Sequence, residues 1–202
     1  MKSALLFVLC VPVLAAQQPK VVRVFLLAGQ SNMEGQAVVD LDHEEHYNGG
    51  RGTLVHVLKD PTKGKKYEHL RDKDGDWVAR PDVRVWYRNH HDELKKGPLS
   101  IGFAVYGGRH HFGPELEFGH AMGNRFKEPV LLVKTAWGGK SLFKDFRPPS
   151  AGGATGPYYG KMLAQYKEIT ASLKAHFPDL SDHRPELTGM VWFQGWNDNA
   201  LI

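Results

Sequence analysis

Continuous hydrophobic runs alternate with amphipathic stretches along this chain, and the two patterns predict strands and helices in turn. Unbroken apolar runs are typical of strands that are buried on both faces of a sheet. Such runs predict strands over residues 21–28, 129–136 and 186–195. Apolar residues at helical spacing predict helices over residues 113–126 and 158–177. The first of these helices begins at Pro114, and Glu115 and Glu117 then follow at the positive end of the helix dipole.

A long irregular segment separates the first strand from the first helix. It covers about residues 38–97 and is rich in His, Lys, Asp and Gly. Within it, residues 53–58 and 83–88 have the composition of strands. Charges of both signs alternate over residues 59–76, which favours a solvated surface over a nucleic-acid-binding patch. We therefore expect a surface insertion here.

Strands that alternate with helices predict an α/β fold with a central parallel sheet. Ligands bind such sheets beyond the carboxyl ends of the strands. Each of the three predicted strands ends abruptly in a polar or glycine-rich motif: GQSN at residues 29–32, WGGKS at 137–141 and QGWND at 194–198. If the strands are parallel neighbours, Ser31, a glycine amide and the Gln194 carboxamide converge at one edge.

These three groups are suited to acyl transfer. A serine hydroxyl becomes nucleophilic when a base removes its proton, and the oxyanion that follows needs fixed N–H donors. The available donors are the Ser31 amide, the Gly138 or Gly139 amide and the Gln194 side-chain NH2. Glycine allows the backbone to approach a ligand closely because it has no Cβ. The sequence around Ser31 lacks the Gly-x-Ser-x-Gly elbow of α/β-hydrolases.

Four motifs together carry a specific resemblance. GQSNMEGQ, HFGPELEFG, KTAWGGKSL and VWFQGWND, in this order, resemble the sialate O-acetylesterase-like carbohydrate esterases of the SGNH-hydrolase superfamily. The resemblance implies a flavodoxin-like three-layer α/β/α sandwich over residues 21–202. It also implies an enzyme that removes O-acetyl groups from carbohydrates without a metal or cofactor. By motif match, Ser31 is the nucleophile and an oxyanion donor, and Gly138 and Gln194 complete the oxyanion hole.

Residues beside these three are expected to contact the substrate, an acetylated sialic acid or polysaccharide. They are Gln30, Asn32, Trp137, Gly139 and Trp196. Trp196 is a departure, because many relatives have glutamate at this position. A larger departure is that no Asp-x-x-His block, which supplies the base in the family, follows Gln194. The fold is therefore expected to be incomplete at its carboxyl end, and the 202-residue chain to have weak turnover, with His110, His111 and His183 as the substitutes considered for the base.

Each motif also has a purely structural interpretation. Ser31 is compatible with a helix N-cap, Gly138–Gly139 with a tight turn and Gln194 with a paired polar residue at a strand end. Trp137 and Trp196 are as compatible with core packing as with stacking on a sugar ring. Two other functions remain open: another acyl hydrolase on the same scaffold, and a catalytically inactive carbohydrate-binding protein.

The first residues have the features of a signal peptide. A basic start at Met1–Lys2 precedes an apolar stretch over residues 4–14 and small residues suited to cleavage near Ala15 or Ala16. Residues 1–16 are therefore expected to direct secretion or periplasmic export, and the apolar stretch is too short to span a bilayer. The only cysteine, Cys10, lies within this segment, so the processed chain has no disulfide.

Composition bounds the remaining possibilities. With 202 residues, 42% hydrophobic and 24% charged, the chain fits one folded domain. The net charge of +4 comes from basic residues scattered among acids, so no nucleic-acid partner is expected. None of the eleven histidines has a spacing that indicates a metal site. The expected partner is the carbohydrate substrate, and the oligomeric state stays open.

Overall fold

The computed structural model describes residues 19–199 and is built around a central five-stranded sheet. The strands lie in the order β4-β3-β6-β1-β7. Their bounds are β1 Lys20–Gly29, β3 Arg80–Arg88, β4 Leu94–Leu99, β6 Val130–Ala136 and β7 His183–Phe193. All neighbouring strands are parallel except β4, which pairs antiparallel with β3. The α/β fold with a central parallel sheet is therefore confirmed.

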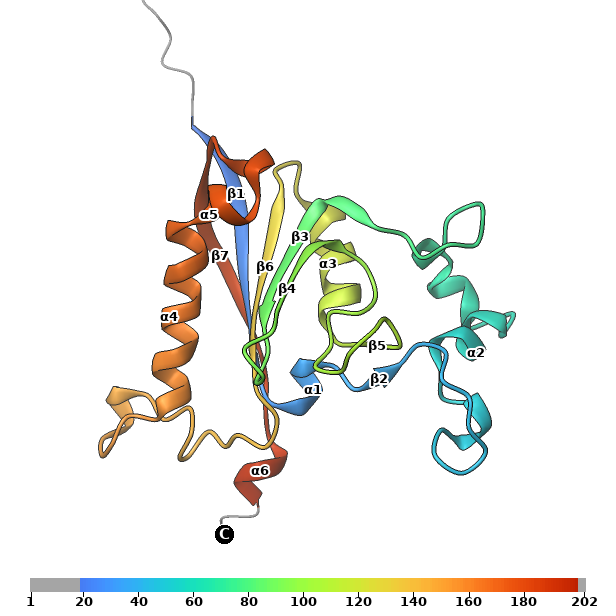
Figure 1. The fold of residues 1–202 in the computed structure, drawn as a ribbon, viewed down its shortest axis with the longest axis horizontal. Coiled ribbons are helices and arrows are strands. Elements are labelled where there is room, and N and C mark those ends of the chain that lie inside the picture. The colour runs from blue at the N-terminus through green and yellow to red at the C-terminus, as the bar shows by residue number, and fades with distance from the viewer. Residues whose placement is uncertain (1–18, 200–202) are drawn as a thin grey trace, which may run out of the picture.

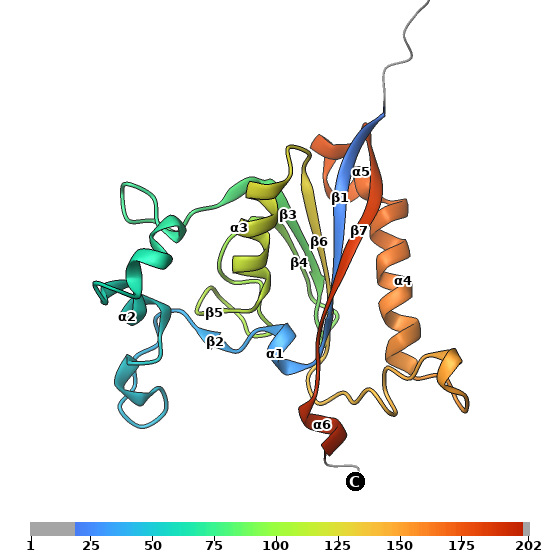
Figure 2. The same ribbon diagram turned by 180° about the vertical axis from the view of Figure 1, so that it is seen from behind.

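Helices cover both faces of the sheet, which gives three layers (Figures 1 and 2). Helix α3 (Glu115–Arg125) lies on one face, and α4 (Pro157–Ala171) with α5 (Leu173–His176) lies on the other. Alternate residues of β1 serve the two cores: Val24 and Leu26 pack with the α4 side, whereas Phe25 and Leu27 pack with the α3 side. A strand buried on both faces must be apolar at every position, which explains its unbroken hydrophobic run.

Most of the predicted elements are present, with two differences. The predicted helix over residues 158–177 is divided at Ser172, whose non-helical backbone separates α4 from α5. The strand expected over residues 53–58 is wrong, because Leu54–Lys59 forms helix α2. Thr53 caps this helix: its hydroxyl accepts a hydrogen bond from the His56 N–H at 3.2 Å. A local cap thus overrides the β-branched composition.

The irregular segment first forms a small lobe beside the sheet, and its last part forms strands of the sheet itself. The lobe contains α2 and short helical turns, η1 Asn48–Gly50, η2 Gly64–Lys66 and η3 Glu68–Leu70. It surrounds a core of Val39, Leu54, Leu70, Ile101 and Leu116. A two-stranded antiparallel sheet, β2 (Ala37–Val38) with β5 (His111–Phe112), connects the lobe to the main body (Figure 1). Residues 80–88 and 94–97 of the expected insertion belong to β3 and β4 of the central sheet.

The remaining elements are short: α1 (Ser31–Glu34), η4 (Pro149–Ala151), η5 (Pro178–Leu180) and α6 (Trp196–Asn199). The expected signal peptide over residues 1–16 lies outside the described residues. Across residues 19–199, no helix has both the length and the apolar character that a membrane crossing requires.

His120 on α3 makes stability depend on pH. Its side chain is buried in contact with the His69 ring, at 4.9 Å between ring centroids. Burial, followed by the charges of His69 and Arg80, lowers the pKa of His120 to about 4. The folded pKa is thus below the unfolded value of about 6.5. The neutral imidazole therefore stabilises the fold above about pH 6.5, and this contribution is lost as the pH falls toward 4.

We expect His120→Gln to weaken this pH dependence. For the wild type, the His120 contribution to the free energy of unfolding falls by about 2 to 3 kcal/mol between pH 7 and pH 4.5. The variant lacks a titrating group here, so its stability difference between the two pH values is smaller by that amount. Urea unfolding at both pH values measures it, with the exposed His56→Gln on α2 as control. An unchanged difference in His120→Gln would contradict the assignment.

Candidate active site

The three motifs meet at one edge of the sheet. In the register of the parallel strands, Gly29 at the end of β1 lies opposite Ala136 of β6 and Phe193 of β7. The chain leaves all three strands at this edge, which is the lower one in Figure 1, where α1 and α6 follow β1 and β7. The structure thus brings Ser31, the Gly138–Gly139 turn and Gln194 to a common edge, as the strand pattern indicated.

A sharp turn after β1 presents Ser31. Gly29 has a φ of 150°, and a Cβ at this position would lie 2.1 Å from the Phe193 carbonyl oxygen, so only glycine fits. The Gln30 carbonyl accepts hydrogen bonds from the Met33 and Glu34 N–H groups at 2.8 and 2.9 Å. Gln30 is the N-cap, and Ser31 is the first residue of the helix rather than its cap. The helix-cap interpretation of Ser31 is therefore wrong.

The backbone of Gly138 packs directly against α1. A Cβ on Gly138 would lie 2.7 Å from Glu34 Oε2 and 3.8 Å from Ser31 Cβ. The first N–H groups of a helix have no partner within it, and the Ser31 amide is one of them. The Gly138 N–H likewise donates to no backbone carbonyl within residues 19–199. Two free donors thus lie close to the Ser31 side chain, while Gly139, with a φ of 72°, completes the turn.

Gln194 connects the third motif to the second. Its Nε2 donates to the Lys140 carbonyl and lies 3.4 Å from Asp198 Oδ2. Its Oε1 is buried and has no partner among the described residues. Both amide hydrogens therefore already face acceptors, so the expected role as an oxyanion donor requires the carboxamide to release one of them.

Asp198 is a residue of this edge that the sequence did not single out. Its carboxylate accepts hydrogen bonds from the Leu142 and Phe143 N–H groups at 2.9 and 2.8 Å. Desolvation acts to raise the pKa of Asp198, but these donors and Gln194 outweigh it and lower the pKa. The ionised side chain ties α6 to the loop that follows the glycines. The sequence feature that could have identified Asp198 was its position in the QGWND motif.

Of the residues expected to contact substrate, two are buried. Trp137 is fully buried, with its ring centroid 5.2 Å from that of Tyr158 in the core beneath α4, and Gln30 is 3% exposed. Among the described residues these two side chains have little surface available for the expected substrate contacts. Asn32 is exposed on α1, and Trp196 is 77% exposed on α6. Exposure depends on how the sheet and helices pack, which motif position alone does not encode.

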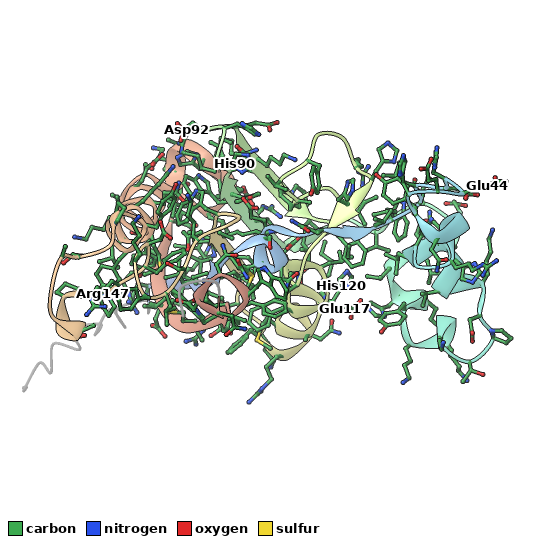
Figure 3. The ribbon with its side chains drawn as sticks, turned by 90° about the horizontal axis from the view of Figure 1, so that it is seen from below. Glu44, His90, Asp92, Glu117, His120 and Arg147 are labelled. Atoms are coloured by element: carbon green, nitrogen blue, oxygen red, sulfur yellow. The ribbon has the colours of Figure 1, made fainter. Side chains whose placement is uncertain are left out.

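Two hollows open at this edge, one on each side of the end of β7. The first, of about 670 Å³, is lined by Leu142, Phe143, Arg147, Trp192, Gln194 and Asp198. The second, of about 490 Å³, is lined by Asn32, Gln36, Phe112, Glu117 and Phe193. Consecutive strand residues point to opposite faces, so Trp192 and Phe193 line different hollows. Arg147 and Glu117 mark the two sides in Figure 3, which views this edge from below.

None of the three histidines considered as a substitute base forms a hydrogen bond with Ser31 among the described residues. His183 pairs in register with Lys20, the first residue of β1, and so lies at the opposite end of the sheet. His110 Nδ1 is 2.7 Å from Asp40 Oδ1. Burial, and then the charge of His110, lowers the pKa of His111. Among the described residues none of the three contacts the Ser31 hydroxyl directly, and His183 is excluded by its position.

A fully buried lysine supports the site from beneath. Lys134 of β6 donates to the Glu34 carbonyl at 2.7 Å, the Phe103 carbonyl at 2.6 Å and Glu115 Oε2 at 2.7 Å. Glu115 Oε1 also accepts from the Gly113 N–H at 2.9 Å. Burial lowers the pKa of Lys134, and the Glu115 charge opposes this. The pair ties β6 to α1 and α3, so Glu115 has a structural role.

Comparisons with known proteins identify a family. The family model described as "Carbohydrate esterase, sialic acid-specific acetylesterase" matches residues 21–201. No curated protein matches. A solved protein from Arabidopsis thaliana is similar at 18% identity and a TM-score of 0.45, over 89% of this chain and 59% of that one. A carbohydrate acetylesterase from Xanthomonas citri is similar at 15% identity and a TM-score of 0.38, over 87% of this chain and 32% of that one. This chain therefore spans less than two thirds of either structure.

Within residues 19–199, no group of three His, Cys, Asp or Glu side chains is placed to bind a metal ion.

Proposed function

Because the chain belongs to the sialic acid-specific acetylesterase family of carbohydrate esterases, we propose that the protein hydrolyses O-acetyl esters of carbohydrates through an acyl-enzyme on Ser31. The observation that carries the proposal is the proximity of Gly138 to Ser31, since a Cβ on Gly138 would lie 3.8 Å from Ser31 Cβ. A nucleophile candidate and two unpaired backbone donors share one accessible edge of the sheet. Such a group of atoms suits the attack of a hydroxyl on an ester carbonyl.

The reaction follows from these groups. Ser31 Oγ attacks the acetyl carbonyl carbon as its proton passes to a general base, and the carbonyl oxygen becomes an oxyanion. The Ser31 and Gly138 N–H groups donate to that oxygen. Collapse breaks the ester bond, and the sugar hydroxyl leaves with the proton from the base. Water then attacks the acetyl-serine, releases acetate and restores the hydroxyl.

The proton acceptor is expected in an Asp-x-x-His block, which the family resemblance places after the third motif. The expected signal peptide would direct the protein to carbohydrates outside the cytoplasm. Exposed Trp196 is proposed to stack on a sugar ring of the substrate, because it presents an accessible aromatic face beside the Gln194 motif.

Acetate release from defined substrates tests this function. The panel, tested with the full-length protein that supplies the expected base, is O-acetylated sialic acid, an acetylated plant polysaccharide, p-nitrophenyl acetate and p-nitrophenyl palmitate. We expect acetate from an acetylated carbohydrate and p-nitrophenyl acetate, but no turnover of the palmitate. Turnover of the palmitate alone would favour a lipid esterase. Binding of the carbohydrate without acetate release would favour an inactive carbohydrate-binding protein.

A further inference from the structure

A buried carboxylate lies beside Ser31 and is not used by the reaction described above. Glu34 ends α1, three residues after Ser31, and its side chain is only 3% exposed. Its Oε1 is 3.1 Å from Nδ1 of His90, which lies on the loop after β3 and is 42% exposed. A buried carboxylate is unfavourable unless it is hydrogen-bonded, and His90 supplies such a bond. Figure 3 shows His90 at the edge of the sheet that carries the site.

The second oxygen of Glu34 lies against the glycine turn. A Cβ on Gly138 would lie 2.7 Å from Glu34 Oε2 and 3.8 Å from Ser31 Cβ. The carboxylate therefore lies between the His90 ring on one side and the Gly138 backbone on the other. A displacement of this side chain changes the space available to the turn, and with it the separation between Ser31 and the Gly138 amide.

Other ionisable groups surround Glu34, and they face different parts of it. Lys134 of β6 donates to the Glu34 backbone carbonyl and to the Glu115 carboxylate of α3. Tyr87 of β3 lies in the same buried region, where burial, followed by the charges of Glu34 and Glu115, raises its pKa. Lys134 therefore holds the backbone of α1, whereas His90 and Tyr87 face the side-chain carboxylate, with His90 Nδ1 at 3.1 Å from Oε1.

We propose that the Glu34–His90 pair positions the two backbone oxyanion donors of the Ser31 site. His90 fixes the Glu34 carboxylate, and the carboxylate fixes the distance between α1 and the Gly138 turn. The imidazole N–H also offsets a negative charge that would otherwise oppose an oxyanion beside Gly138. This inference rests on the proposed esterase function. It makes His90 a positioning residue that does not touch the substrate.

Variants of His90 in the full-length protein test the proposal. His90→Ala removes the donor, and an error of about 1 Å in catalytic geometry lowers turnover by about 100-fold. We expect kcat for acetate release to fall about 10- to 100-fold with KM unchanged. His90→Asn keeps an N–H donor near the Nδ1 position and is expected to recover most of the kcat. The control is His91→Ala, whose ring lies 3.8 Å from that of His90 on the exposed side and should leave kcat unchanged.

A double-mutant cycle with Glu34→Gln gives a second measurement. If the two residues act as a pair, the combined loss in His90→Ala/Glu34→Gln is smaller than the product of the two single losses. Multiplicative losses would overturn the proposal. So would wild-type kcat in His90→Ala, an equal loss in His91→Ala, or His90→Asn no more active than His90→Ala.

The outcomes also separate this proposal from the esterase function itself. An active Ser31→Ala variant would remove the proposed function, whereas an inactive Ser31→Ala beside a fully active His90→Ala would remove only the positioning role. If His90→Ala does not fold, as judged by thermal unfolding, His90→Asn is compared with His90→Gln, which moves the amide donor away from the Nδ1 position. A higher kcat for the asparagine variant supports the proposal, and equal kcat values overturn it.

Discussion

Replacing Ser31 with alanine is expected to lower acetate release by the full-length protein by on the order of 10³- to 10⁶-fold. The substitution removes the atom that attacks the acetyl carbon, so no acyl-enzyme forms. The Ser31 and Gly138 N–H groups remain and can leave a residual rate above that in water. Initial rates with p-nitrophenyl acetate and with an acetylated carbohydrate measure the effect. Near-normal turnover by Ser31→Ala would contradict the assignment of the nucleophile.

The fold is expected to tolerate this change. Gln30 rather than Ser31 is the N-cap of α1, and the Gln30 carbonyl still accepts the first helical N–H groups. The free energy of unfolding should therefore change by no more than about 0.5 kcal/mol. Ser181→Ala is the matched control, because this exposed serine precedes β7 at the opposite end of the sheet. It should retain full turnover.

Replacing Lys134 with methionine is expected to reduce the free energy of unfolding by about 3 to 5 kcal/mol. The ammonium group and the Glu115 carboxylate are both completely buried, with 0% exposed side chains. The variant leaves Glu115 as an uncompensated buried acid and leaves the Glu34 and Phe103 carbonyls without this donor. Urea unfolding at pH 7 measures the loss.

A second substitution separates the charge from the packing. Lys134→Met/Glu115→Gln removes both charges, so we expect it to be more stable than Lys134→Met, although the two carbonyls remain unpaired. Lys20→Met is the control, because its pair with Asp182 is exposed, at 63% and 57%, and should contribute less than about 1 kcal/mol. A wild-type midpoint for Lys134→Met would contradict the role of this lysine.

The local pattern of apolar and polar residues was sufficient to predict the buried strands and the edge of the sheet at which the site lies. The runs at β1 and β6 are apolar at nearly every position because these strands are covered on both faces, so burial leaves a direct mark on the sequence. Parallel strands have their carboxyl ends at the same edge, so the motifs that follow β1, β6 and β7 had to meet. The start of α3 could also be predicted from the sequence, because Pro114 and the acidic residues after it favour a helix N-terminus through interactions within one helical turn.

Only the tertiary structure decided how individual side chains face that edge. Trp137 and Trp196 both belong to motifs that follow strands of the sheet, yet one is fully buried beneath α4 and the other is 77% exposed. Glu34 and His90 are separated by 56 residues, and the bond between them depends on where the loop after β3 passes α1. Strand and helix periodicity records which positions are apolar over a few residues. Contacts between distant segments arise from packing and sheet order, which that local periodicity does not contain.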